Sequence, residues 1–190
     1  MKNYPRIYSL STLGLIHHYE NDYLFHNMRT DFVGDSGSGK SIIADLLQLI
    51  FVGSEMFESA TRTMDEKREL DGLVLRTPHK GIDIGYAFLN IEIQSRHYIV
   101  IGCYLESNSK RTKPFIIQGS SDPKANLLPI GQPLQTKDFK REGNICPLDD
   151  LLSQMEEKGL FLSYWETVKP YHRILYTHDT VSYTHLRAHE

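Results

Sequence analysis

Cysteine is scarce in this sequence. The 190 residues contain two, Cys103 and Cys146, which lie far apart and form no CxxC pair or Cys/His cluster with the spacing of metal ligands. This scarcity argues against a zinc site, and it fits a protein of a reducing compartment in which both thiols are ordinary residues.

Long apolar runs are missing as well. No stretch approaches the roughly 20 apolar residues that span a bilayer, and no signal-peptide core follows the first six residues. An excess of basic residues is also lacking, since the formal net charge is −3. We therefore expect a cytoplasmic protein without a membrane partner. The charge balance argues against a histone-like binder but leaves room for a local basic patch.

The remaining composition, with 40% hydrophobic and 24% charged residues, suits a globular core. We expect one lobe over residues 1–120, and its continuation as a loop and helices over residues 121–180. Residues 181–190 (VSYTHLRAHE) resemble an in-frame translation of a sequencing adapter, and such scars are excluded from fold reasoning. The native reading frame is then expected to be interrupted near residue 180. The alternative is a native histidine-rich tail.

One motif carries recognisable chemistry. The run Gly34-Asp35-Ser36-Gly37-Ser38-Gly39-Lys40-Ser41 matches the P-loop pattern G-x-x-x-x-G-K-[ST] in full. Its glycines permit backbone angles and close approaches that a Cβ atom obstructs. Successive N–H groups can surround phosphate oxygens, and a helix beginning near Ser41 directs its partial positive charge to the same anion. Lys40 would contact the β- and γ-phosphates of ATP, and Ser41 would bind Mg²⁺. The alternative is a glycine-rich turn without a ligand.

Hydrophobic periodicity predicts a helix over residues 41–51, with Gly53 at its C-terminal cap. Strands are predicted before the P-loop over residues 6–16, 23–26 and 29–33, with a polar turn at residues 20–22.

Beyond the P-loop helix, residues 54–73 are weakly patterned and are predicted to be a mobile connection. Three β-rich runs follow at residues 85–94, 98–106 and 114–118. Because their separations are too short for parallel crossovers, we expect antiparallel hairpins. The remaining chain is predicted to form a surface loop, an amphipathic helix and an aromatic-anchored segment, at residues 119–143, 148–162 and 165–176.

The flanks of the P-loop carry a resemblance to a family. Residues 7–16 (IYSLSTLGLI), 23–25 (YLF) and 32–47 (FVGDSGSGKSIIADLL) are similar to the N-terminal head lobe of SMC, Rad50 and MukB-like ATPases. The similarity covers roughly residues 6–120, and the P-loop is its most specific part. It lies nearest the divergent SMC-like proteins of bacterial anti-plasmid and anti-phage systems. The resemblance implies an α/β, ABC-type P-loop NTPase lobe, with a mixed sheet and an antiparallel hairpin region around the P-loop helix.

The resemblance also implies ligands and partners. In that family a coiled coil and a C-terminal lobe follow, two heads enclose Mg-ATP, and hydrolysis opens and closes them around DNA. This sequence departs from the family because it shows no Walker B strand, no signature motif and no coiled-coil heptads, and because Asp31 occupies a usually apolar strand. An interrupted reading frame would explain the first three absences. We expect the chain alone to hydrolyse ATP inefficiently.

Other residues are weaker candidates. Gln118 follows an apolar run and resembles the Q-loop glutamine of SMC heads, which contacts Mg²⁺ and the attacking water. Gln94 is a weaker candidate for the same role. The alternative for Gln118 is a polar residue that ends a strand and has no catalytic role. Some basic residues could bind DNA phosphates or form solvated turns: Lys110, Arg111, Lys113, Lys137, Lys140 and Arg141. Three arginines could sense nucleotide or DNA or simply be exposed: Arg62, Arg68 and Arg76. The pair His17-His18 has no partner at metal spacing and is interpreted as structural.

Three other functions share a P-loop: a small-molecule kinase of the uridine-kinase or phosphoribulokinase type, an ABC transporter ATPase subunit, and a regulatory domain that binds nucleotide without turnover. Such kinases usually place the loop after their first strand and continue with alternating strands and helices. Here 33 residues precede Gly34, and the following region looks antiparallel. A transporter subunit would need membrane partners.

Overall fold

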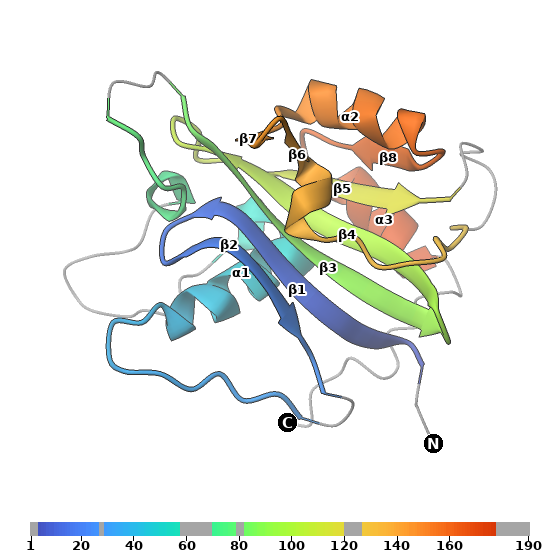
Figure 1. Cartoon of the computed structure of the whole chain (residues 1–190), viewed down its shortest axis with the longest axis horizontal. Helices are drawn as coiled ribbons and strands as arrows, with labels where there is room; N and C mark the ends of the chain where they lie inside the picture. The colour runs from blue at the N-terminus through green and yellow to red at the C-terminus, as the bar shows by residue number, and fades with distance from the viewer. Residues whose placement is uncertain (1–3, 27–28, 58–69, 79–81, 120–126, 178–190) are drawn as a thin grey trace.

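The computed structural model describes residues 4–26, 29–57, 70–78, 82–119 and 127–177. Within these ranges the largest sheet has six strands in the order β2-β1-β3-β4-β5-β8 (Figure 1). Their bounds are β1 Arg6–Leu15, β2 His18–Leu24, β3 Ile84–Gln94, β4 His97–Glu106, β5 Lys113–Gln118 and β8 Phe161–Tyr164. All five neighbouring pairs are antiparallel. The predicted α/β class and the antiparallel hairpins of β3, β4 and β5 are confirmed. The predicted mixed sheet is wrong for the described residues, where every neighbouring pair of this sheet is antiparallel.

Both faces of this sheet are covered, which explains why β3 and β4 are apolar along most of their length. Helices α1 (Lys40–Val52) and α3 (Val168–Thr177) pack on one face, together with the short 3₁₀ turn η2 (Leu70–Leu73). The 3₁₀ turn η1 (Ser54–Met56) follows α1 and buries no residue. The other face carries helix α2 (Leu148–Glu157), the 3₁₀ turn η3 (Thr136–Phe139) and a small hairpin of β6 (Lys140–Arg141) and β7 (Asn144–Ile145). Figure 1 shows these two layers on either side of the strands.

Helix α1 agrees closely with its prediction. Its inward side chains lie at helical spacing and are buried: Ile42, Ile43, Leu46, Leu49 and Ile50. Gly53 ends the helix with φ 78°, and its N–H donates to the Leu49 carbonyl at 3.0 Å. With ψ 173° Gly53 adopts a conformation that glycine tolerates and other residues rarely adopt, and it is the C-cap of α1, so the C-cap prediction is confirmed.

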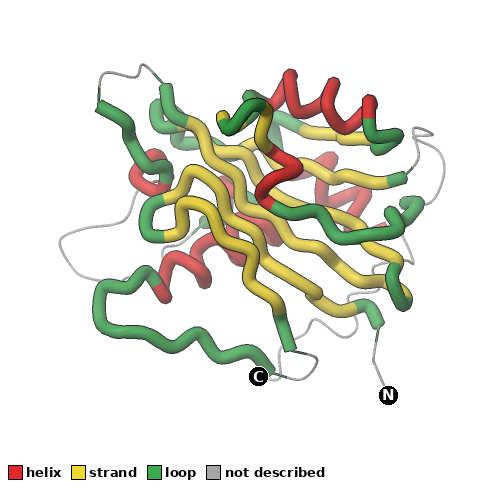
Figure 2. The backbone as a smooth tube through the Cα atoms, viewed as in Figure 1, coloured by secondary structure: helices red, strands yellow, loops and turns green. Residues whose placement is uncertain are grey.

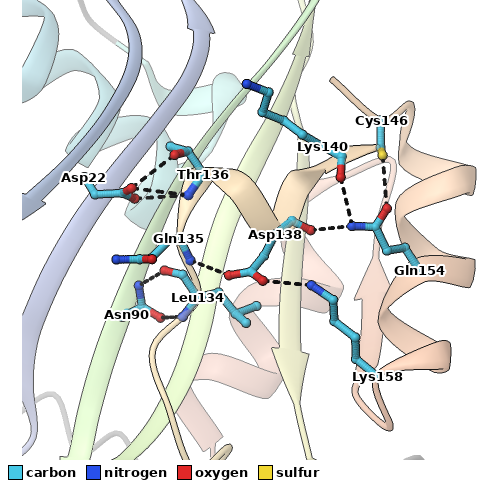
Figure 3. A network of polar contacts seen from close by, with 10 residues as sticks. All are labelled: Asp22, Asn90, Leu134, Gln135, Thr136, Asp138, Lys140, Cys146, Gln154 and Lys158. Carbon is cyan, nitrogen blue, oxygen red and sulfur yellow. Dashed lines mark hydrogen bonds and ion pairs between the residues drawn. The ribbon is translucent and has the colours of Figure 1, made fainter. Parts of the chain in front are cut away.

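Polar side chains fix the segment around η3 to the sheet (Figure 3). The Asn90 amide donates to the Leu134 carbonyl and accepts from the Leu134 N–H, both at 2.8 Å. Asp22 accepts from the N–H and hydroxyl of Thr136 at 3.1 and 3.0 Å. On the far side Gln154 donates to the Asp138 carbonyl at 2.8 Å. The segment has little regular structure, and these contacts satisfy its backbone groups.

Two predictions before the P-loop are wrong. Residues 20–22 are not a turn but part of β2, and the turn lies at Ile16 and His17, whose φ is 61°. Because β2 is an edge strand, its acidic side chains can remain at the surface, where Glu20 pairs with Lys140 at 2.8 Å.

The strand predicted at residues 29–33 is also absent from the described structure, which has no regular element there. Arg29 and Asp31 pair with each other at 2.8 Å in solvent, and Val33 is 93% exposed. No neighbouring strand in the described chain offers hydrogen bonds to this segment.

The helix predicted at residues 148–162 is too long. It ends at Glu157, after which Gly159 adopts φ 70° and residues 161–164 join the sheet as β8. Within 165–176, α3 forms with Pro170 in its first turn, where a missing N–H is tolerated. The described residues of the 119–143 region are largely irregular, as predicted, but they include η3 and β6, and Ile130, Leu134 and Phe139 are buried and not at the surface. Most of the connection predicted at 54–73 lies outside the described residues, as do residues 120–126 and 181–190.

Candidate functional site: the P-loop at the start of helix α1

The P-loop (residues 34–41) lies outside the sheet: it follows the irregular segment 29–33, and its last two residues begin α1. Figure 2 shows residues 29–39 as a loop that leads into the helix. Residues 34–38 are exposed, whereas Gly39 is buried where the loop joins the helix. The loop is therefore open to a solvent-borne ligand along most of its length and anchored to the protein at its last residue.

The loop has the tight backbone that its glycines predict. Gly37 and Gly39 adopt φ values of 83° and 87°, in the left-handed region that disfavours other residues. Gly39 is also the N-cap of α1, and its carbonyl accepts from the N–H of Ile42 at 2.9 Å. The N–H of Ser38 donates to the Asp35 carbonyl at 3.2 Å. The first turn of α1, which the structure describes in full, has no acidic residue that would repel an anion from the positive end of the helix.

Lys40 is folded back over the loop. Its ammonium donates to the carbonyls of Gly34 and Asp35, both at 2.6 Å, and approaches the Ser38 hydroxyl at 3.3 Å. Ser41 follows as the second residue of α1 and is half-buried. The positive charge of Lys40 thus lies against the loop, where two neutral backbone carbonyl oxygens accept its hydrogen bonds.

Two residues of β2 hold the loop in place. His18 is buried, and its Nε2 lies 2.9 Å from the Gly39 carbonyl oxygen, while its Nδ1 lies 2.7 Å from the Tyr23 hydroxyl. The Tyr23 ring also meets Phe32, just before the loop, edge-on at 5.6 Å. The sequence indicates only a structural role for His18. Its link to Gly39 joins residues 21 positions apart, so no local pattern reveals it.

Gln118, the possible Q-loop residue, is not brought to the P-loop. It ends β5 near the start of β4, whereas His18 lies at the hairpin turn beside the end of β4. About seven residues of β4 separate these two ends, which corresponds to roughly 23 Å along the sheet. The Gln118 side chain is buried and accepts from the N–H of Leu128 at 3.1 Å, which is a structural contact. Gln94, at the end of β3, lies at the same remote end.

The basic residues considered for DNA binding are dispersed, and several are neutralised by carboxylates. Lys113 pairs with Glu166 at 3.0 Å, and Lys140 pairs with Glu20. Arg141 pairs with Glu157 at 3.4 Å. Arg76 donates to the Ser107 carbonyl at 3.1 Å, while Arg62 and Arg68 lie outside the described residues.

The rest of the described chain offers no metal centre and no membrane span. These ranges contain no cluster of three or more His, Cys, Asp or Glu residues that could hold a metal ion. None of the helices in the same ranges is long and apolar enough to cross a bilayer. No protein-family model matches the chain, and no curated protein matches it. The P-loop is therefore the feature on which a functional assignment depends.

Proposed function

We propose that this chain is the ATP-binding head lobe of an SMC-like, DNA-associated ATPase, and that residues 34–41 bind Mg-ATP. One observation carries the proposal: an exposed loop with left-handed glycines leads into the N-terminus of a 13-residue helix, and a lysine ammonium lies over that loop. Backbone N–H groups, helix dipole and ammonium all favour a polyphosphate in this position.

The residues present fit the phosphates and the metal ion of that ligand. Lys40 would exchange the carbonyls of Gly34 and Asp35 for the β- and γ-phosphates, a change that replaces neutral acceptors with charged ones. The Ser41 hydroxyl would contribute to Mg²⁺ binding. Bound Mg²⁺ would supply positive charge to the phosphates, and the protein's part is to position them.

The sheet argues against a kinase. A small-molecule kinase would alternate strands and helices around a parallel sheet, whereas all six strands here are antiparallel to their neighbours. Such a sheet is also not typical of P-loop enzymes, so the assignment requires more chain. We propose that a C-terminal lobe supplies strands for the extended segment 29–35, and that a second head and DNA complete the assembly. Hydrolysis would depend on these partners.

Isothermal titration with Mg-ATP tests nucleotide binding directly. Lys40→Ala should weaken binding at least tenfold, or about 1.4 kcal/mol, because the ammonium is lost from the loop. Lys137→Ala is the matched control: Lys137 is exposed on η3, which packs on the opposite face of the sheet from α1, so its removal should leave the affinity unchanged. Equal affinities for the unsubstituted chain and Lys40→Ala would refute the phosphate-binding role.

The SMC-like role has its own test in the gene downstream. A long heptad-repeat region followed by a second lobe is expected. A short α/β ending in its place would select the kinase.

A further inference from the structure

We infer that His18 is a positioning residue for the phosphate-binding loop: its imidazole sets the orientation of the peptide that joins Gly39 to Lys40. This inference rests on the proposed function, because it concerns how the same loop presents its donors to a polyphosphate. It goes beyond that proposal by assigning a role to a side chain on a different element, β2.

The hydrogen-bond roles follow from the partners. A carbonyl oxygen only accepts, so His18 Nε2 carries a hydrogen and donates it to the Gly39 carbonyl at 2.9 Å. In the neutral ring Nδ1 then accepts, and the Tyr23 hydroxyl donates to it at 2.7 Å. Burial raises the pKa of Tyr23, so the phenol keeps the proton that this arrangement requires. Tyr23 thereby fixes both the tautomer and the tilt of the imidazole.

Peptide planarity transmits this constraint to the loop. The Gly39 carbonyl and the Lys40 N–H belong to one trans peptide, so they point in opposite directions. With the carbonyl held toward His18, the Lys40 N–H is directed away from β2. It is among the first N–H groups of α1, which have no partner within the helix and are the donors that an anion at a helix N-terminus uses.

Steric contact on the same side strengthens the constraint. A Cβ atom built on Gly39 would lie 2.7 Å from His18 Nε2 and 2.8 Å from the Cβ of His17. The hairpin turn and the loop are therefore packed closely against each other at Gly39. The Gly39 carbonyl also accepts the Ile42 N–H at 2.9 Å, so the His18 hydrogen bond adds to a bond of the helix in holding this peptide.

Side-chain replacements separate positioning from packing. In His18→Gln the amide nitrogen reaches about the same place as Nε2 and can donate to Gly39, whereas His18→Asn is too short and His18→Leu has no donor. In Mg-ATP titrations we expect His18→Leu and His18→Asn to bind about fivefold to tenfold more weakly, the effect of one lost hydrogen bond. His18→Gln should remain within about twofold of the unsubstituted chain.

The matched control is His172→Leu. His172 Nε2 also lies 2.8 Å from a backbone carbonyl, that of Phe51, but at the opposite end of α1. Loss of the His172 imidazole should lower the unfolding midpoint without changing the affinity for Mg-ATP. Tyr23→Phe gives a second, gentler test, since it keeps the ring and removes only the hydroxyl that orients His18; an affinity about twofold to fivefold weaker is expected.

The outcomes distinguish the two proposals. If the unsubstituted chain does not bind Mg-ATP, the proposed function fails. If it binds and Lys40→Ala weakens binding, but His18→Leu and Tyr23→Phe match the unsubstituted chain, only the role of His18 is overturned. That role is also overturned if His18→Gln and His18→Leu lose affinity equally, because packing alone would then explain the loss. If His18→Leu does not fold, the role of His18 is decided by the Mg-ATP affinity of Tyr23→Phe and by the affinities of His18→Gln and His18→Asn compared with each other.

Discussion

Gly37 and Gly39 look equivalent in the sequence, yet their surroundings differ. Their φ values are similar, at 83° for Gly37 and 87° for Gly39. A Cβ atom on Gly37 would meet nothing within 4 Å, whereas a Cβ atom on Gly39 would collide with His17 and His18. Gly37→Ala should therefore carry only the left-handed penalty, about 1–2 kcal/mol of unfolding free energy. Gly39→Ala adds an overpacking penalty and should lose about 3 kcal/mol or more.

Urea denaturation of the two variants measures this difference, and Mg-ATP titration should rank them in the same order. If Gly39→Ala were as stable as Gly37→Ala, the result would contradict a tight contact between the loop and the β1–β2 turn. That result would also remove the steric support for His18 as a positioning residue.

At the scale of elements, α3 completes the C-terminal end of the P-loop helix. The buried Tyr171 hydroxyl donates to the Ile50 carbonyl at 2.8 Å, and His172 donates to that of Phe51. The last carbonyls of a helix lack partners within it, so α3 satisfies acceptors that burial would otherwise leave without a donor. Tyr171→Phe should destabilise the protein by about 1–3 kcal/mol, since it leaves a buried acceptor without this donor.

Tyr164→Phe is the comparison for that experiment. The Tyr164 hydroxyl lies 3.3 Å from Asp149 in a solvent-exposed contact, so its removal should change unfolding free energy by under about 0.5 kcal/mol. Equal midpoints for the two variants in chemical denaturation would argue that α3 does not cap α1.

Elements differ in how far the sequence predicts them. Strands β3 to β5 are predictable because each is a β-rich apolar run and short turns join them. Helix α1 is predictable because its apolar residues recur at helical spacing. The segment 29–33 has β-prone residues, but a strand also needs partners, and none in the described chain adjoins it. The helix boundary at Glu157 was missed because apolar residues continue past Gly159 into β8.

The residues of the candidate site also differ in how far the sequence predicts them. The P-loop residues 34–41 were predictable because the loop and its helix are contiguous in the chain. His18 and Tyr23 were not, since they reach Gly39 through the fold of the β1–β2 hairpin. Conversely, Gln118 matched a local pattern, yet the register of the sheet carries it to the far end from the loop.

For the molecule as a whole, burial of the sheet has a consequence for alkaline stability. Burial raises the pKa of the Cys103 thiol from 9.0 to about 12. Above pH 9 the unfolded chain releases this proton and the folded chain does not, so the stability contributed below pH 9 is lost as the pH rises toward 12. Relative to Cys103→Ala, the unsubstituted chain should lose about 1.4 kcal/mol between pH 8 and pH 10.

Urea denaturation at the two pH values provides the comparison. Burial also raises the pKa of Tyr86 and Tyr104, but both are present in either variant, and their contributions cancel in the difference. If the difference in unfolding free energy between the unsubstituted chain and Cys103→Ala were the same at both pH values, the raised pKa of the Cys103 thiol would be contradicted.

Binding of a triphosphate by residues 34–41 is the property on which the proposed function depends, and amide chemical-shift mapping with Mg-ATP tests it most directly. We predict the largest shifts at the N–H groups of Gly37, Gly39 and Lys40, smaller shifts with AMP, and little change in α2 on the opposite face of the sheet. Shifts centred elsewhere, or no shifts at millimolar Mg-ATP, would contradict it.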